Sequence, residues 1–493
     1  MATTVKELHL TCLDQTVLRM YIRHLLVFPF PDPSYAEAAV NALRVGFTAV
    51  LADFPFLAGT ILPSDSESRR ITLKYPENVT SDLVSQILSI SFDQAKNPNL
   101  DYESLGREGM PPLKLPGDLF CPELVRDHPG LDDRFAEGIT RFKKGLSIPV
   151  FAAQANFIPG GLIVSVYAHH SAMDGNGLGQ VYQIWSDHVR SHIRREQTPN
   201  LVAPSAQSIS TAQDNATDPS YSRRTLDALA KCFPSTTNLR EVRTPGTTPT
   251  VLRNARYNLK AKIFVFKASK ITSLSAQLSS KTNTHISIFT TLSALLWTHI
   301  TRARSAVLAG KGIQKTELGI AFDHRKNLGS PFTRTFFGNC ATGVTVPLPV
   351  SNLIPSGPLR AEDLASIAVD IAQSLSAVNL KWLQARLSYF SQTPNPSALS
   401  LNLDLVNGPD LFITSWLHMG ADCDWGIPGT GNDGYPIAIR KPMCANEGSI
   451  VLLPRQKDGG QGFEALVCLE QGEMEAAGRS LGEGMWLERI IDA

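Results

Sequence analysis

The chain has 493 residues, more than one ordinary hydrophobic core accommodates, so we expect two or three domains. Its 46 Lys and Arg residues balance 45 Asp and Glu residues, so no overall charge draws it to nucleic acid or to an anionic membrane. The seven cysteines are scattered and form no C-x-x-C pair, which argues against a disulfide framework and against a zinc site.

The N-terminal stretch carries Lys6 and Glu7 and lacks the apolar segment of a signal peptide. No stretch of the chain approaches the roughly 18–20 apolar residues that span a membrane. The scattered cysteines favour a reducing compartment. We therefore expect a cytoplasmic protein that has no membrane partner.

The first 145 residues indicate strands and one helix, followed by a loop-rich region. Alternation over residues 5–30 predicts a strand, a short turn and a second strand. Apolar residues recur at helical spacing from Tyr35 to Leu51. The block Phe54–Gly59 ends that helix and leads into a strand at Thr60–Leu62, and prolines then mark loops to about residue 145.

A strand and a helix meet around two adjacent histidines. Gly161–Val166 is a short, β-branched run typical of a buried strand, and the segment after residue 177 repeats apolar residues at spacings of three and four. His169, His170, Asp174 and Gly175 lie at the junction. Such a junction holds side chains firmly and leaves them reachable from a cleft.

A histidine at this junction can serve as a general base near neutral pH. The alternative is a pair of satisfied core histidines with a capping aspartate, and the His-His-x-x-x-Asp-Gly spacing favours the catalytic interpretation. Adjacent residues on a strand point to opposite faces, so His169 and His170 make a poor chelate, and we expect no metal.

A polar, aperiodic stretch from Thr198 to Ser222 is the best linker candidate. It divides the chain into an N-terminal lobe (residues 1–197) and a C-terminal lobe (residues 223–493). In the second lobe, strands are predicted at residues 261–266, 317–322, 411–416, 450–453 and 463–469, and helices at residues 270–278, 286–303 and 361–387. The alternation predicts two mixed α/β lobes.

Two known sequence motifs, one for dinucleotide binding and one for hydrolysis, occur in the sequence without the structural context that they require. Gly429–Gly434 spells G-x-G-x-x-G, but no long strand leads into it and Tyr435-Pro436 follows where a helix should open. Gly478–Gly482 spells G-x-S-x-G, but no strand precedes it and no histidine follows Ser480 to complete a hydrolase triad. We therefore expect neither a dinucleotide site nor a serine hydrolase.

Seven short blocks follow one another along the chain: Leu13-Asp14-Gln15, Phe54-Pro55-Phe56-Leu57-Ala58-Gly59, His170-Ser171-Ala172-Met173-Asp174-Gly175, Asp323-His324-Arg325, Phe337-Gly338-Asn339, Thr414-Ser415-Trp416 and Asp422-Cys423-Asp424-Trp425-Gly426. In this order they resemble the BAHD acyltransferases, acyl-CoA-dependent enzymes of the chloramphenicol-acetyltransferase-like superfamily, and above all their fungal secondary-metabolite members. The first block is similar to the opening strand, and the next four are similar to F-x-P-L-A-G, H-x-x-x-D-G, D-x-R and F-G-N.

Three residues depart from the family pattern. Phe56 replaces the proline of F-x-P-L-A-G, and Cys423 and Asp424 replace the Phe and the first Gly of D-F-G-W-G. If that glycine normally sits at positive φ, aspartate tolerates the left-handed conformation at modest cost. The departure affects the shape of the loop more than the chemistry.

The resemblance implies two chloramphenicol-acetyltransferase-like lobes, each a mixed sheet flanked by helices, with the reaction centre in a tunnel between them. Acyl-CoA enters from one side and the acceptor from the other. His170 is then the general base, because an attacking alcohol or amine must lose a proton. Thr414 and Trp416 are the candidate donors to the oxyanion, the alternative for both being a strand-end packing pair.

Asp174 is the obvious partner for His170 in a triad, but the resemblance implies that it turns away and pairs with an arginine, for which Arg325 is our candidate. Gly175 then braces the turn. The block with Asp422, Trp425 and Gly426 is expected to hold the architecture of the tunnel, and Asp422 has a weaker claim to acid or base work.

The phosphates of CoA require basic residues at one mouth of the tunnel. Lys267 and Lys270 open a predicted helix, and Arg302 and Arg304 end another. The positions favour an ordinary solvated or helix-end charge for each of these residues, so we assign none of them individually to CoA.

We expect an acyl-CoA-dependent O-acyltransferase that acts, with acetyl-CoA as co-substrate, as a monomer on a hydroxyl of a fungal secondary metabolite. The alternatives are an N-acyltransferase on an amine acceptor, a condensation-domain-like amide-forming enzyme, and a non-catalytic binding protein on the same scaffold. Condensation domains normally adjoin a carrier domain with a phosphopantetheine serine, and no such segment is visible. Retention of His170, Asp174 and Gly175 together argues against the non-catalytic alternative.

Overall fold

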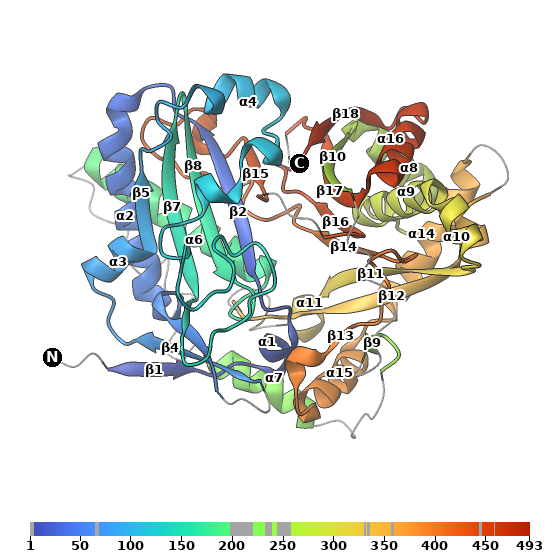
Figure 1. The fold of residues 1–493 in the computed structure, drawn as a ribbon, viewed down its shortest axis with the longest axis horizontal. Coiled ribbons are helices and arrows are strands. Elements are labelled where there is room, and N and C mark those ends of the chain that lie inside the picture. The colour runs from blue at the N-terminus through green and yellow to red at the C-terminus, as the bar shows by residue number, and fades with distance from the viewer. Residues whose placement is uncertain are drawn as a thin grey trace.

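Two lobes lie side by side in the computed structural model, each built on one main β-sheet (Figure 1). The structure describes residues 4–64, 69–197, 220–231, 239–243, 258–329, 332, 336–355, 359–442, 446–457 and 459–493. The sheets are mixed or antiparallel and carry helices on their faces, which confirms the predicted α/β class. No helix in this described part of the chain is long and apolar enough to cross a membrane.

Within the described residues, the main sheet of the first lobe has the strand order β15-β2-β8-β7-β5. The strands are β2 (Tyr21–Pro29), β5 (Leu88–Ser91), β7 (Phe151–Ile158), β8 (Gly161–His169) and β15 (Ala438–Arg440). One face packs against α2 (Ala36–Asp53) and α6 (Gly175–Gln197), and the other packs against residues 100–120, which include α4 (Tyr102–Glu108) and α5 (Gly117–Phe120). Because both faces are covered, β2 and β8 are buried along almost their whole length rather than at alternate residues.

The segment Leu13-Asp14-Gln15 is not a strand, contrary to the prediction from the resemblance. It lies in a short helix, α1 (Cys12–Thr16), which begins where the Thr11 side chain accepts a hydrogen bond from the Asp14 backbone N–H. The Asp14 side chain accepts in return from the Thr11 backbone N–H, which completes a capping box. This local pairing stabilises a helical turn between β1 (Val5–Leu8) and β2.

A smaller sheet beside the first has the order β1-β4-β3-β6 and adds β3 (Thr60–Pro63), β4 (Ile71–Pro76) and β6 (Ile148–Pro149). The main sheet of the second lobe has, in the described ranges, the order β12-β11-β14-β16-β17-β10-β18. Its strands are β10 (Leu259–Phe266), β11 (Lys315–Asp323), β12 (Ala341–Pro349), β14 (Leu411–Ser415), β16 (Ser449–Leu452), β17 (Phe463–Glu470) and β18 (Leu487–Asp492).

Helices α8 (Ala268–Thr282), α9 (Ile288–Ala303), α14 (Ala361–Ser376) and α16 (Gln471–Glu483) share one apolar core with this sheet. The predicted helix at residues 361–387 is in fact two helices, α14 and α15 (Leu380–Gln392). Asn379 separates them because its side chain caps α15 by accepting from the Trp382 backbone N–H.

The shorter elements are α3 (Ser81–Ile87), α7 (Tyr221–Lys231), α10 (Ser305–Gly310), α11 (Arg325–Leu328), α13 (Val350–Leu353), β9 (Val242–Arg243) and β13 (Ser400–Leu401). Most of the predicted linker, residues 198–219, lies outside the described residues. Its last two residues, Tyr221 and Ser222, already belong to α7.

One segment of the C-terminal half returns to the first lobe. Strand β15 pairs antiparallel with β2, in register Ile439 to Leu26, and it lies among the blue and teal strands in Figure 1. Trp425 is fully buried in the core of the first lobe, where its ring packs against Trp185 and Phe28. The predicted boundary at residue 222 therefore does not separate the two lobes completely, because part of the C-terminal half packs into the first lobe.

Candidate active site

His170 follows the last residue of β8, and its backbone N–H donates to the Met20 carbonyl at 2.8 Å. The neighbouring His169 is fully buried and faces the other way, with its ring edge-on to Tyr21 at 5.2 Å between centroids. Burial, the largest cause, and smaller contributions from the neighbouring His170 and Arg19 side chains lower the pKa of His169 to about 3. His169 is therefore a neutral packing residue, and only His170 is partly exposed.

The side-chain amide of Asn339 fixes how the His170 ring carries its proton. Asn339 Nδ2 donates to the His170 carbonyl at 2.7 Å and to Asp14 Oδ1 at 2.8 Å, so the amide can present only Oδ1 to the ring. That oxygen lies 3.1 Å from His170 Nδ1. Nδ1 therefore carries the hydrogen, and Nε2 is left as the acceptor of the neutral ring.

Asp174 does not contact His170 but forms a buried, bidentate ion pair with Arg325. Arg325 Nη1 and Nη2 donate to the two carboxylate oxygens at 2.8 and 2.9 Å, and the backbone N–H groups of Gly177 and Cys340 donate to the same oxygens. Burial alone would raise the pKa of Asp174, but the Arg325 charge and these hydrogen bonds outweigh burial and lower it. The pairing agrees with what the family resemblance implies.

Arg325 also connects the motif blocks of the second lobe to this turn. Its guanidinium donates to the carbonyls of Phe336 and Gly338, beside the F-G-N block, and to Asp323 of its own block. Phe337 of that block in turn packs against Phe54, with ring centroids 4.3 Å apart. The H-x-x-x-D-G, D-x-R and F-G-N blocks and the block that begins at Phe54 therefore pack together around the turn after β8.

Two glycines at the start of α6 lie closer to their neighbours than a side chain would allow without a shift. A Cβ on Gly175 would lie 2.1 Å from Met419 Cε, and a Cβ on Gly177 would lie 2.2 Å from the Phe337 carbonyl oxygen. The contact at Gly177 is with backbone, so it cannot be relieved by a rotamer change. The sequence prediction named Gly175 and missed Gly177.

Trp416 comes from the second lobe and reaches the first. It follows β14, packs against the apolar cores of both lobes, and lies over the His24 ring at 4.5 Å between centroids. Its Cδ1 atom would be 3.9 Å from a Cβ on Gly175, which places the indole beside the His170 turn. Thr414, two residues earlier, points to the same side of the strand, and none of its described contacts reaches His170.

The block Asp422–Gly426 packs mainly against α6 and not against the turn after β8. Asp422 is exposed and accepts from the Lys457 backbone N–H. Asp424, which replaces the family's glycine, is not at positive φ, and it accepts a hydrogen bond from Arg190 at 3.0 Å. The residue at positive φ is Gly426, at +55°. The substitution by aspartate therefore creates an ion pair with α6 and requires no left-handed backbone.

Of the basic residues considered for CoA, Arg304 is buried and paired with Glu473 at 2.8 Å, so it serves the fold of the second lobe. Sequence reasoning gave no role to Asn339 or Asp14, although both lie in quoted blocks, and it missed Arg223 altogether. In the described ranges, no group of three His, Cys, Asp or Glu side chains gathers as a metal site would require.

The sequence model of the Transferase family matches residues 127–480, and that of the trichothecene 3-O-acetyltransferase-like N-terminal domain matches residues 20–188. Eremophilane O-acetyltransferase of Penicillium rubens is 25% identical over 435 residues, which cover 83% of this chain and 84% of the relative. Trichothecene 8-O-acetyltransferase of Fusarium sporotrichioides is 24% identical over 516 residues, which cover 97% of both chains.

Among solved structures, Fusarium sporotrichioides TRI101 in complex with coenzyme A and T-2 superposes with a TM-score of 0.76 at 21% identity, covering 99% of this chain and 100% of that one. Vinorine synthase gives a TM-score of 0.57 at 17% identity, with 98% of both chains covered. The architecture is therefore that of the two-lobed, chloramphenicol-acetyltransferase-like enzymes. The chain belongs to the Transferase family and is an acyltransferase of the fungal BAHD type.

Proposed function

We propose that this enzyme transfers an acetyl group from acetyl-CoA to a hydroxyl group of a small secondary metabolite, with Nε2 of His170 as the general base. The observation that carries the proposal is the Asn339 amide, which holds the His170 ring in the tautomer whose Nε2 can accept a proton. The turn that holds His170 lies where Trp416 of the second lobe meets the first.

The reaction needs no covalent acyl-enzyme. As the acceptor oxygen forms its bond to the thioester carbonyl carbon, its proton passes to His170 Nε2. The tetrahedral intermediate then breaks its carbon–sulfur bond, and the CoA sulfur leaves with the electron pair and takes the proton back from the imidazolium. The base is neutral again at the end of the cycle.

The negative charge on the intermediate's oxygen requires a fixed donor. The Trp416 indole N–H and the Thr414 hydroxyl are the donors that we assign to it. Trp416 is held by its backbone N–H, which donates to the Leu452 carbonyl at 2.8 Å, and by its ring contact with His24. The base then comes from the first lobe and the oxyanion donors from the second.

The relatives support the substrate classes in this proposal. TRI101 structures contain coenzyme A, together with T-2 or deoxynivalenol, and the relatives named above are O-acetyltransferases of eremophilanes and trichothecenes. We infer a hydroxylated terpenoid-like acceptor by this comparison. We also place the enzyme in the cytoplasm as a monomer, in keeping with the free thiols of the five cysteines that the structure describes.

The test is acetyl-CoA turnover against a panel of hydroxylated terpenoids, with thiol release and product mass measured together. We expect thiol release that depends on the acceptor and a product that gains one acetyl group. The matched control is the methyl ether of each active alcohol, which should give neither. Thiol release that proceeds equally with the ethers, or acetylation confined to amine acceptors, would overturn the proposal.

A further inference from the structure

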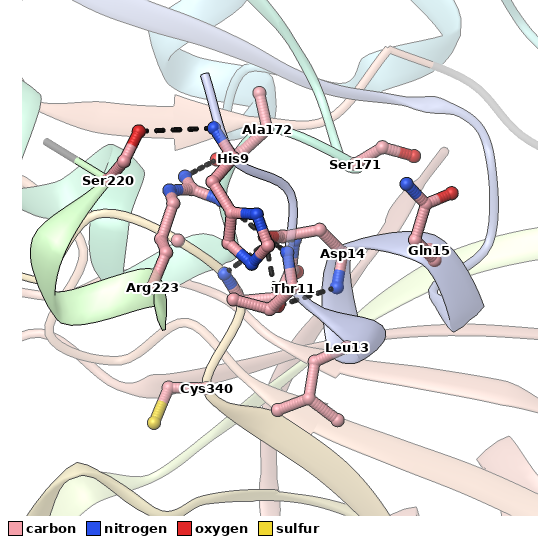
Figure 2. A network of polar contacts seen from close by, with 12 residues as sticks. His9, Thr11, Leu13, Asp14, Gln15, Ser171, Ala172, Ser220, Arg223 and Cys340 are labelled. Atoms are coloured by element: carbon pink, nitrogen blue, oxygen red, sulfur yellow. Dashed lines mark hydrogen bonds and ion pairs between the residues drawn. The ribbon is translucent and has the colours of Figure 1, made fainter. Parts of the chain in front are cut away.

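A second ion pair, between Asp14 and Arg223, is buried beside the catalytic turn. Asp14 lies in α1 and is fully buried, and Arg223, 2% exposed, lies in α7. The Arg223 guanidinium donates from Nη1 to Asp14 Oδ2 and from Nη2 to the Ala172 carbonyl at 2.7 Å. Figure 2 shows the Arg223 side chain beside both Ala172 and Asp14.

Both oxygens of the Asp14 carboxylate are fully engaged. Oδ2 accepts from the backbone N–H and the hydroxyl of Thr11, at 2.8 and 2.9 Å, and from Arg223. Oδ1 accepts from the backbone N–H and from the side-chain Nδ2 of Asn339, at 3.0 and 2.8 Å. One oxygen is therefore anchored by the N-terminal segment and α7, and the other orients the Asn339 amide.

Two residues on one face of helix α7 form hydrogen bonds with the N-terminal segment. Arg223 and Asp227 are four residues apart, so they lie one turn above each other. Asp227 accepts from the Cys12 backbone N–H at 3.0 Å and is paired with the His9 ring at 2.8 Å. These contacts fix where Arg223, and through it Asp14, is held.

Stability alone is a weak reason for such an arrangement. A buried ion pair is often no more stabilising than apolar residues of the same volume, because its desolvation offsets its attraction. Here the carboxylate does something that an apolar residue could not do. It accepts the Asn339 Nδ2–H, and together with the bond from Nδ2 to the His170 carbonyl this contact sets which atom of the amide faces His170 Nδ1.

We propose that Asp14, held by Arg223 and Thr11, is a positioning residue that acts on the catalytic base through Asn339. It fixes the orientation of the Asn339 amide, which in turn fixes the tautomer and ring position of His170. Arg223 adds a second constraint through the Ala172 carbonyl, which holds the turn after the base. This inference rests on the proposed role of His170 as the base.

The test is a double-mutant cycle on kcat with Asp14→Ala and Asn339→Ala in the full-length enzyme. We expect Asp14→Ala to lower kcat by about tenfold to a hundredfold, because a misplaced base loses its near-attack geometry. KM for acetyl-CoA should stay within about twofold of the wild-type value, since the substrate contacts remain. In the Asn339→Ala background, Asp14→Ala should lower kcat no further.

Thr11→Val is the milder variant if Asp14→Ala does not fold. It keeps the shape of the side chain and the backbone donor but removes the hydroxyl that donates to Asp14 Oδ2 and that accepts from the Asp14 backbone N–H. We expect a smaller loss of kcat that also disappears in the Asn339→Ala background. An unchanged kcat in Thr11→Val and Asp14→Ala, or losses that multiply independently with that of Asn339→Ala, would overturn the inference.

Glu464→Ala is the matched control. Glu464 pairs with Arg440, which is buried and, like Arg223, also donates to backbone carbonyls. None of the described bonds of this pair reaches His170 or Asn339, so the variant should lose stability but keep kcat. His170→Ala separates the two proposals. If it abolishes transfer while the cycle is additive, only the positioning inference fails, and if it leaves turnover intact, the proposed base fails.

Discussion

Asp174 and Arg325 are 151 residues apart in sequence, and their side chains form a two-point ion pair in which each carboxylate oxygen also accepts a backbone N–H. The aspartate of the His-x-x-x-Asp-Gly block thus joins the two lobes and lies away from the imidazole. Because of this arrangement, loss of the Asp174 carboxylate charge should lower the stability of the fold.

Asp174→Asn should lower the free energy of unfolding by about 3–5 kcal/mol, because the buried Arg325 charge loses its bidentate partner and keeps only the single carboxylate contact with Asp323. The measurement is the urea midpoint followed by tryptophan fluorescence. The matched control is Asp422→Asn, at an exposed carboxylate, which should cost less than about 1 kcal/mol. A fully stable Asp174→Asn protein that shows only a slower rate would contradict the structural role.

Gly177→Ala should impair both folding and turnover, since its Cβ would lie 2.2 Å from the Phe337 carbonyl oxygen and would push the F-G-N block away from the turn. Gly179→Ala in the same helix is the control, because its Cβ would meet Met419 only at an ordinary contact distance of 3.7 Å. Alanine in place of this helical glycine should even add up to about 1 kcal/mol of stability. The measurement is the thermal melting midpoint, which should be lower for Gly177→Ala than for Gly179→Ala. Equal midpoints for the two variants would contradict the prediction.

Three buried histidines make stability depend on pH. Burial, the largest cause, lowers the pKa of His24, His169 and His324 to about 3, from an ordinary value of 6.5. The unfolded chain takes up protons below pH 6.5, whereas the folded chain does not until about pH 3. Stability from these groups is therefore present above pH 6.5 and is lost as the pH falls through that window.

The check is the urea midpoint at about pH 7.5 and about pH 5, for wild type and His169→Phe. Phenylalanine keeps an aromatic ring beside Tyr21 but removes one titrating group, so the midpoint should fall less on acidification. His285→Phe, at an exposed position, should follow the wild type. If His169→Phe loses as much stability on acidification as the wild type, His169 is not held neutral.

Trp416→Phe and Thr414→Val separate the oxyanion role from simple packing. Phenylalanine retains a ring over His24 but loses the indole N–H, and valine retains the shape of threonine but loses the hydroxyl. The variant that removes an oxyanion donor should lower kcat by about 100-fold to 1,000-fold with little change in KM. If both variants keep the wild-type kcat and only lower the melting temperature, the pair is a packing contact at the end of the strand.

The sequence predicted most local structure correctly, including α2, β8 and α6, because apolar periodicity is a local property. It failed at Leu13–Gln15, where a capping box outweighed the expected strand. It also failed at residues 421–440, which are closer in sequence to the second lobe and pack into the first. Pairings of this kind depend on contacts between distant segments and leave no periodic signal.

The polar part of the site shows the same limit. The pairing of Asp174 with Arg325 was accessible because both residues lie in recognisable blocks. Asn339 is an ordinary amide in sequence, and its role becomes evident only because His170, 169 residues before it, and Asp14, 325 residues before it, meet in the fold. Arg223 lies in no quoted block and follows a polar stretch, so nothing in the sequence distinguished it.

The adjacent histidines allow the most direct test of the catalytic account. His170→Ala and His169→Phe are compared for single-turnover acetyl transfer to an active alcohol, with folding verified by melting temperature and coenzyme A binding. The account predicts that His170→Ala binds coenzyme A but loses transfer by at least about 100-fold, the contribution of a general base. His169→Phe should retain most of the transfer rate. Equal transfer by His170→Ala and the wild type would contradict the assignment of His170 as the base.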